Sequence, residues 1–174
     1  MDESPGKYSD ITIKRANKED LAELTLCADE FIGLINEFKV NFLDGKYISL
    51  LTFYNKIAVA VLIAEELNQK VDSIENILPK TVLKLIYVNP NYRNKLLGTK
   101  LLLTFLKLQK EKGFASVYVE LPQKYKSGIR FFEINDFRRI GKVKEMLLLE
   151  INLWNDFGLR FSQFLPDTFF HILD

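Results

Sequence analysis

The residues best suited to chemistry lie where an apolar strand runs through a short turn into a long helix, between Ile86 and Thr99. The first amides of a helix have no acceptor within the helix, and the helix dipole is positive at that end, so such a junction stabilises a bound phosphate. Gly98 lets a ligand approach the backbone closely, and Arg93 and Lys95 can add positive charge. The sequence therefore predicts a site for a pyrophosphate at this turn.

The same pattern has an ordinary structural explanation. Many strand-turn-helix units carry a glycine and two cations for packing and solubility. The two commonest phosphate-binding motifs, GxxxxGK[ST] and GxGxxG, are absent from the sequence. The turn by itself leaves both hypotheses open, a phosphate site and a plain junction.

Two signatures in the correct order make the sequence resemble the GNAT superfamily of acyl-CoA-dependent N-acetyltransferases. The pyrophosphate loop of that family follows Val-x-Pro-x-x-(Arg/Gln)-x-x-Gly-x-(Gly/Ala), and this sequence matches it at Val88, Pro90, Arg93 and Gly98. The second signature, roughly Phe-Tyr-Glu-Lys-Asn-Gly-Phe, is similar to FFEINDF at residues 131–137. The resemblance covers residues 11–153, including the order of strands and helices.

The resemblance implies an α+β fold: a mixed, mostly antiparallel sheet with helices on both faces and a V-shaped split between the fourth and fifth strands. Acetyl-CoA would bind in that split, its pantetheine arm paired with backbone groups of Ile86, Tyr87 and Val88. The pyrophosphate would be held by amides of the turn, those of Arg93, Asn94, Lys95, Leu96, Leu97, Gly98 and Thr99. Phe131 and Phe132 would lie near the thioester or the pantetheine.

The implied activity is transfer of an acetyl group from acetyl-CoA to a primary amine, by direct attack in a ternary complex. An alkylammonium with a pKa near 10.4 is only about one part in 10³ neutral at pH 7, so a group or a water chain must take its proton. Glu120, on the strand that flanks the cleft, is a candidate base, and so are Glu65 and Glu66. Tyr125 is a candidate acid. A solvated glutamate and a packing tyrosine are the open alternatives for these side chains.

Two positions depart from the family pattern. Leu96 stands where the first loop glycine is usual, and Phe132 stands where many members have a tyrosine that protonates the departing thiolate. These departures motivate a second hypothesis, a GNAT-fold module that binds CoA or a partner protein without turnover. The amine acceptor itself, a small molecule or a protein, has no signature in the sequence.

Composition excludes several other classes of protein. The 174 residues predict one domain over residues 1–174, and 24 Lys and Arg against 23 Asp and Glu give no bulk attraction to nucleic acid. One Cys and one His cannot supply a four-ligand zinc site, so we expect no metal. The longest apolar run, residues 57–64, is far short of the roughly 18 residues of a membrane span. With a polar N-terminus, the sequence predicts a cytoplasmic protein.

Hydrophobic periodicity predicts the elements that would position these residues. We expect strands at residues 11–14, 47–54, 57–65, 81–88 and 116–120 and a strand pair ending near residue 153. We expect a first helix that begins near residue 17 and three further helices over residues 30–42, 93–112 and 127–135. Residues 1–10 are expected to be flexible. The aromatic extension at residues 154–174 is expected to cover the domain's own sheet, to line the acceptor pocket, or to form a homodimer contact.

Overall fold

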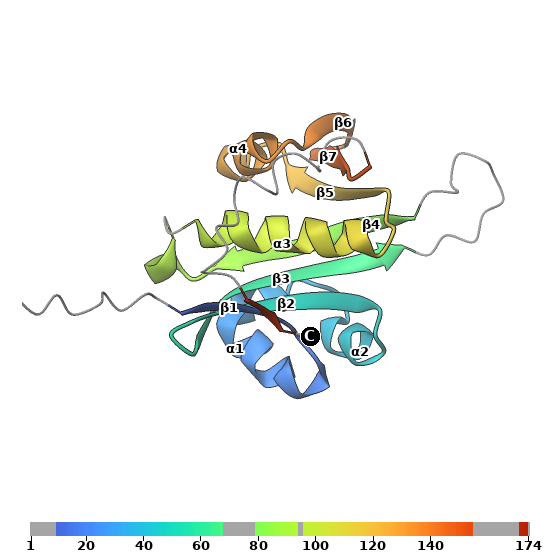
Figure 1. Cartoon of the computed structure of the whole chain (residues 1–174). Helices are drawn as coiled ribbons and strands as arrows, with labels where there is room; N and C mark the ends of the chain where they lie inside the picture. The colour runs from blue at the N-terminus through green and yellow to red at the C-terminus, as the bar shows by residue number, and fades with distance from the viewer. Residues whose placement is uncertain (1–9, 68–78, 94–95, 155–170, 174) are drawn as a thin grey trace, which may run out of the picture.

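The computed structural model describes residues 10–67, 79–93, 96–154 and 171–173, which form one sheet with helices on both faces (Figure 1). The strands are β1 (Ile11–Arg15), β2 (Tyr47–Tyr54), β3 (Ile57–Leu67), β4 (Lys80–Val88), β5 (Ser116–Pro122), β6 (Arg138–Val143), β7 (Met146–Asn152) and β8 (His171–Leu173). Their order across the sheet is β6-β7-β5-β4-β3-β2-β1-β8. Neighbouring strands are antiparallel except for β4 with β5 and β1 with β8, which are parallel.

Helices cover both faces of this sheet. The helices are α1 (Leu21–Ile32), α2 (Phe38–Leu43), α3 (Leu97–Glu111) and α4 (Lys126–Ile134), with short 3-10 turns η1 (Lys18–Asp20) and η3 (Pro90–Tyr92). In Figure 1, α3 lies in front of the sheet, and α1 and α2 lie below it. The predicted fold, a mixed and mostly antiparallel sheet with helices on both faces, is confirmed.

Among the described residues, the two largest hydrophobic clusters lie on opposite faces of the sheet and hold the layers together. The strand period of two sends Leu50 and Leu62 toward the core under α3, and Leu51 and Ile63 toward the core under α1 and α2. These four side chains are fully buried. Burial of each contributes about 1.5–3 kcal/mol. This explains why β3 is apolar on both faces.

The split between the fourth and fifth strands is also present. Pairing of β4 with β5 ends at Leu83 with Val119, and β4 continues to Val88 without β5 beside it. At the same point β4 contains a bulge, because Ala64 of β3 pairs with Leu83 and Ile63 pairs with Leu85, which leaves Lys84 as the extra residue. A bulge bends its strand and increases the twist, so Lys84 accounts for the divergence of the two strands.

Two predicted helices differ from those observed. The helix expected over residues 30–42 is interrupted, because α1 ends at Ile32 and α2 begins only at Phe38, preceded by Glu37 with a φ of 50°. The helix expected from Arg93 begins at Leu97, because Arg93 is extended and Leu96 is left-handed. Left-handed residues interrupt a right-handed helix, and periodicity of apolar side chains does not reveal them.

The predictions made for the two ends of the chain stay predictions. Residues 1–9 and 155–170, where the flexible terminus and most of the aromatic extension were expected, lie outside the described residues. Strand β8 pairs with β1, so the chain returns to the edge of its own sheet. The homodimer contact stays a prediction. In the ranges that the structure describes, helices are too short or too polar to span a membrane, and His, Cys, Asp and Glu form no group suited to a metal ion.

Candidate active site

A cleft of about 690 Å³ opens where β4 and β5 part. Its walls are residues 83–88 of β4 and 119–121 of β5, and the turn before α3 and residues of α4 also line it. Phe31 of α1 also lines it. Clefts of several hundred Å³ are typical of small-molecule and cosubstrate sites. On the side where β4 has lost β5, its backbone groups face this cleft instead of a neighbouring strand.

One end of the cleft is the turn predicted to bind pyrophosphate. Asn91 N–H donates to the Asn89 side chain at 3.0 Å, and Arg93 Nε donates to the Val88 carbonyl at 3.0 Å, so the turn is tied to the end of β4. The α3 helix then begins at Leu97, and its first amides have no acceptor within the helix. This end of the cleft therefore offers amides and partial positive charge to an anion.

The structure brings most of the predicted phosphate residues to this end. Those that line the cleft are Arg93, Leu96, Leu97, Gly98 and Thr99. Asn94 and Lys95 lie outside the described residues. The predicted pantetheine residues Ile86, Tyr87 and Val88 line the strand wall, with Phe131 and Phe132 among the α4 residues that line the cleft.

Gly98 lies between the strand wall and α4. A β-carbon built on Gly98 would lie 3.6 Å from Cγ2 of Val88 and 3.7 Å from the ring of Phe131. These are ordinary van der Waals distances, so a methyl group would fit there and a longer side chain would enter the cleft. The glycine thus keeps this part of the cleft open for a ligand.

Leu96 has a φ of 59° and a ψ of 17°, in the left-handed region, and its side chain is largely exposed. A residue with a β-carbon pays roughly 1–2 kcal/mol for this conformation, and glycine avoids most of that cost. The backbone at Leu96 therefore has the conformation that a glycine adopts readily, although this chain has a leucine there. Leu96 therefore differs from the family pattern in its side chain, while the left-handed backbone conformation that suits a glycine is retained.

The start of α4 also lines the cleft. Tyr125 precedes this helix, lines the cleft and has 53% of its surface exposed. Phe132, at the position of the usual acidic tyrosine, is 3% exposed and packs against Phe137 with ring centroids 5.0 Å apart. Tyr125, unlike Phe132, has a hydroxyl group, and Tyr87 and Tyr92 are further tyrosines that line the cleft.

The three candidate glutamates occupy different surroundings. Glu120 is exposed and lines the cleft, and no hydrogen bond or ion pair joins its carboxylate to another of the described residues. Glu65 is paired with Lys46 at 3.4 Å and with Lys84 at 3.2 Å. Glu66 is bound by Lys112 and accepts a hydrogen bond from Gln109 at 3.3 Å. Neither Glu65 nor Glu66 lines the cleft, so the geometry favours Glu120.

Tyr118 is a nearby titratable group that the sequence analysis missed. It lies two residues before Glu120 on β5, so both side chains point to one face of the sheet, and its register partner on β7 is Glu150. Burial raises the pKa of the Tyr118 phenol, and the charges of Glu120, Glu65 and Glu150 raise that pKa further. The phenol therefore stays protonated at neutral pH. The alternation along β5 was the signal that could have identified it.

Phe31 is a second residue that the sequence analysis did not place at the site. Its three- and four-residue spacing from Ala28 and Leu24 is typical of the apolar face of a helix. In the structure its ring lies 5.0 Å from that of Tyr87, at the cleft, and 38% of its surface is exposed. Helical spacing identifies which face is apolar but does not distinguish a buried position from one that borders a cavity.

Known proteins share this sequence pattern and this fold. The model of the acetyltransferase (GNAT) family matches residues 18–137, more than half of the chain. The PaiA N-acetyltransferase of Thermoplasma acidophilum, solved in complex with coenzyme A, is 19% identical and has a TM-score of 0.63, with 82% of this chain and 99% of that chain covered. NAA60 of Arabidopsis thaliana, solved with acetyl-CoA, is 14% identical and has a TM-score of 0.67, with 82% and 98% covered. A GNAT-family acetyltransferase of Staphylococcus aureus is 21% identical and has a TM-score of 0.63, with 83% and 99% covered. Among curated proteins no sequence gives a significant match.

Proposed function

The chain belongs to the acetyltransferase (GNAT) family, as its two signatures indicated, and on that premise we propose that it transfers an acetyl group from acetyl-CoA to a primary amine. One observation carries the proposal: the cleft between β4 and β5 is lined both by the N-terminus of α3 and by Glu120 of β5, which carries a carboxylate. The first feature suits the diphosphate of a CoA ester, and the second suits an amine.

The donor would occupy the cleft along β4. Its pyrophosphate would meet the amides from Leu97 to Thr99, with Arg93 at the rim and Gly98 leaving room for the chain. Its pantetheine arm would take the place of the missing β5 strand and pair with the backbone of residues 86–88. Similar proteins solved with coenzyme A or acetyl-CoA support this assignment, since the fold is shared. Asn94 and Lys95 belong to the same proposed turn.

The reaction would proceed by direct attack of the amine on the thioester. The amine nitrogen forms a bond with the acetyl carbon, the carbon–sulfur bond breaks, and the CoA thiolate leaves. We assign the proton of the amine to Glu120, directly or through water, and the proton that neutralises the thiolate to Tyr125. A backbone N–H of β4 on the cleft side would stabilise the oxyanion of the tetrahedral intermediate.

A binding module without turnover is the second candidate. The observation that favours it is Phe132, which is packed in the core and has no proton to give at the position of the usual acid. Such a module would bind CoA in the same cleft. The two candidates differ in one property, the release of free CoA in the presence of an amine.

The test measures the release of CoA thiol from acetyl-CoA with a panel of primary amines. We expect turnover in the native protein and a loss of roughly 100-fold in kcat/KM in Glu120→Gln, because a positioned base contributes about 10²–10⁴-fold. Glu23→Gln, at an exposed position on α1, is the matched control and should keep native activity. Binding of acetyl-CoA without turnover for any amine would favour the module, and a fully active Glu120→Gln would remove Glu120 from the mechanism.

A further inference from the structure

Helix α1 has a kink at Ala28, just before its last turn. Ala28 has a φ of −137° and a ψ of 35°, which are not helical values, although the chain continues as a helix on both sides. One turn earlier, the Thr25 hydroxyl donates to the Leu21 carbonyl at 2.8 Å, a type of bond that bends helices. Ala28 is 2% exposed, so the kink is fixed in the core rather than at a frayed end.

Phe31, three residues after the kink, lies apart from the buried apolar face of α1. Leu24 and Ile32 of the same helix are buried in the core under α1 and α2. Phe31 instead lies against Tyr87, with ring centroids 5.0 Å apart and ring planes at 36°, and both rings line the cleft. A large aromatic side chain that is 38% exposed at a cavity has apolar surface left for a ligand.

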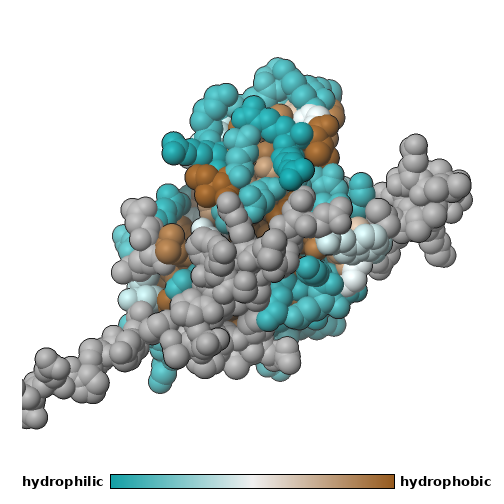
Figure 2. Space-filling view, turned by 45° about the horizontal axis from the view of Figure 1, so that its top comes forward, coloured by the Kyte–Doolittle hydropathy of each residue, from teal (hydrophilic) through white to brown (hydrophobic). Residues whose placement is uncertain are grey.

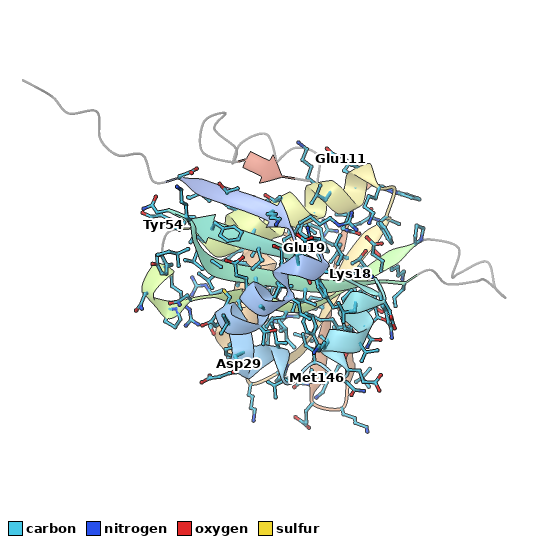
Figure 3. All side chains as sticks on the ribbon, turned by 90° about the horizontal axis from the view of Figure 1, so that it is seen from below. Lys18, Glu19, Asp29, Tyr54, Glu111 and Met146 are labelled. Carbon is cyan, nitrogen blue, oxygen red and sulfur yellow. The ribbon has the colours of Figure 1, made fainter. Side chains whose placement is uncertain are left out.

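This aromatic pair lies on the side of the sheet opposite to α3. Figure 3 shows Asp29 of α1 and Met146 at the start of β7 toward one side of the sheet, with Glu111 of α3 toward the other. The CoA diphosphate is assigned to the N-terminus of α3, so we assign the approach of the acceptor amine to the α1 side. Glu120 lines the same cleft from β5, across from the aromatic pair on α1 and β4.

We infer that Phe31 and Tyr87 form the acceptor-binding wall, and that they select a primary amine carried on an apolar alkyl or arylalkyl chain. The inference rests on the proposed function and names the substrate class for the same site. Aromatic faces attract an ammonium group and bury the carbon chain attached to it, while Glu120 meets the nitrogen. An amine on a short polar chain would bury less apolar surface against these rings and would gain less from this wall.

The test is calorimetric titration of the CoA-saturated protein with two amines, 2-phenylethylamine and ethanolamine, repeated without CoA. Because CoA is the product, no acetyl group is transferred and the titration reports binding alone. We expect the native protein to bind 2-phenylethylamine at least about tenfold more tightly than ethanolamine. Phe31→Ala should weaken that binding about tenfold and should change ethanolamine binding less than about twofold. Leu34→Ala, at a residue that is 81% exposed and does not line the cleft, is the matched control.

The outcomes separate this inference from the proposed function. Equal affinity for the two amines, or a preference that survives in Phe31→Ala, would overturn the inference even if acetyl-CoA is consumed. Turnover of either amine supports the proposed function whatever the preference. If Phe31→Ala loses its circular dichroism signal, Phe31→Leu provides the test, because leucine keeps the apolar contact and should lose only part of the preference.

Discussion

The ring of Tyr125 lies directly over the α-carbon of Gly128. A β-carbon at position 128 would lie 2.3 Å from Cε1 and 2.4 Å from Cδ1 of that ring, far inside any allowed contact. Gly128 is buried in the first turn of α4, and Tyr125 is the residue before that helix. The glycine therefore permits the position that brings the phenol of Tyr125 to the cleft.

This relationship predicts that Gly128→Ala acts through Tyr125. The added methyl group must displace the ring, so kcat should fall about as far as in Tyr125→Phe, by roughly tenfold or more. The double variant should be no worse than either single variant, because both changes remove the same group. Alanine favours a helix by about 1 kcal/mol over glycine, so the free energy of unfolding should not fall. Steady-state kinetics test this, and native kcat in Gly128→Ala would remove Tyr125 as the acid.

The left-handed conformation of Leu96 predicts an unusual response to glycine. Leu96→Gly relieves roughly 1–2 kcal/mol of backbone strain and costs about 0.4–1 kcal/mol through the entropy of the unfolded chain. We expect the free energy of unfolding in urea to stay the same or to rise by up to about 1 kcal/mol. Leu34→Gly is the control, since Leu34 is similarly exposed and has no positive φ, and it should lower that free energy. Equal losses in both variants would contradict the account of Leu96.

The start of α1 predicts a dependence of stability on pH. Burial opposes ionisation of Asp20, but the Asn17 amide at 2.8 Å and Lys14 at 2.7 Å outweigh it and hold the pKa of Asp20 below its usual range. The stability from this lowered pKa is present above about pH 4, the ordinary range of an aspartate, and is lost as the pH falls through the folded value. Asp20→Asn should lower the free energy of unfolding by about 1–2 kcal/mol at pH 7.

The measurement for Asp20 is urea unfolding at pH 7 and at pH 3. The difference in the free energy of unfolding between native protein and Asp20→Asn should narrow at pH 3, because this pH lies below the ordinary pKa of an aspartate and the unfolded state takes up a proton there. Asp29→Asn, on the exposed face of α1, should have the same free energy of unfolding as the native protein at both pH values. If native protein and Asp20→Asn differed in free energy of unfolding by the same amount at both pH values, the charge of the Asp20 carboxylate would contribute nothing to stability.

The sequence predicted the architecture well because its signals are local. Alternating and continuous apolar runs located β2, β3 and β4 to within two residues, and the two family signatures ordered the rest of the fold. The polar turn at residues 89–93 and Gly98 were recognised from residue type alone. Glu120 was named from its position at the end of a strand, and the structure adds that its carboxylate lines the cleft while Glu65 and Glu66 are engaged elsewhere.

The features that were not predicted depend on contacts far apart in the sequence or on single backbone angles. The pairing of β8 with β1 joins residues more than 150 positions apart, and three residues carry no pattern. The kink at Ala28 and the bulge at Lys84 replace regular geometry at one residue each, yet they position Phe31 and open the split. Figure 2 shows a mainly hydrophilic surface with small apolar patches at the top of the molecule, over α4, β6 and β7. Ile140 and Val143 of β6 are exposed, although both residue types are usually buried.

The central claim is that acetyl-CoA binds in the cleft with its pyrophosphate at the N-terminus of α3. Calorimetric titration with acetyl-CoA of native protein, Gly98→Ala and Gly98→Glu tests it most directly. We expect the native protein to bind acetyl-CoA with micromolar affinity. Gly98→Ala should lose at most about tenfold in affinity, because its β-carbon fits beside Val88 and Phe131. Gly98→Glu should show no measurable binding, because it adds bulk and negative charge. Absence of binding by the native protein, or native affinity in folded Gly98→Glu, would contradict it.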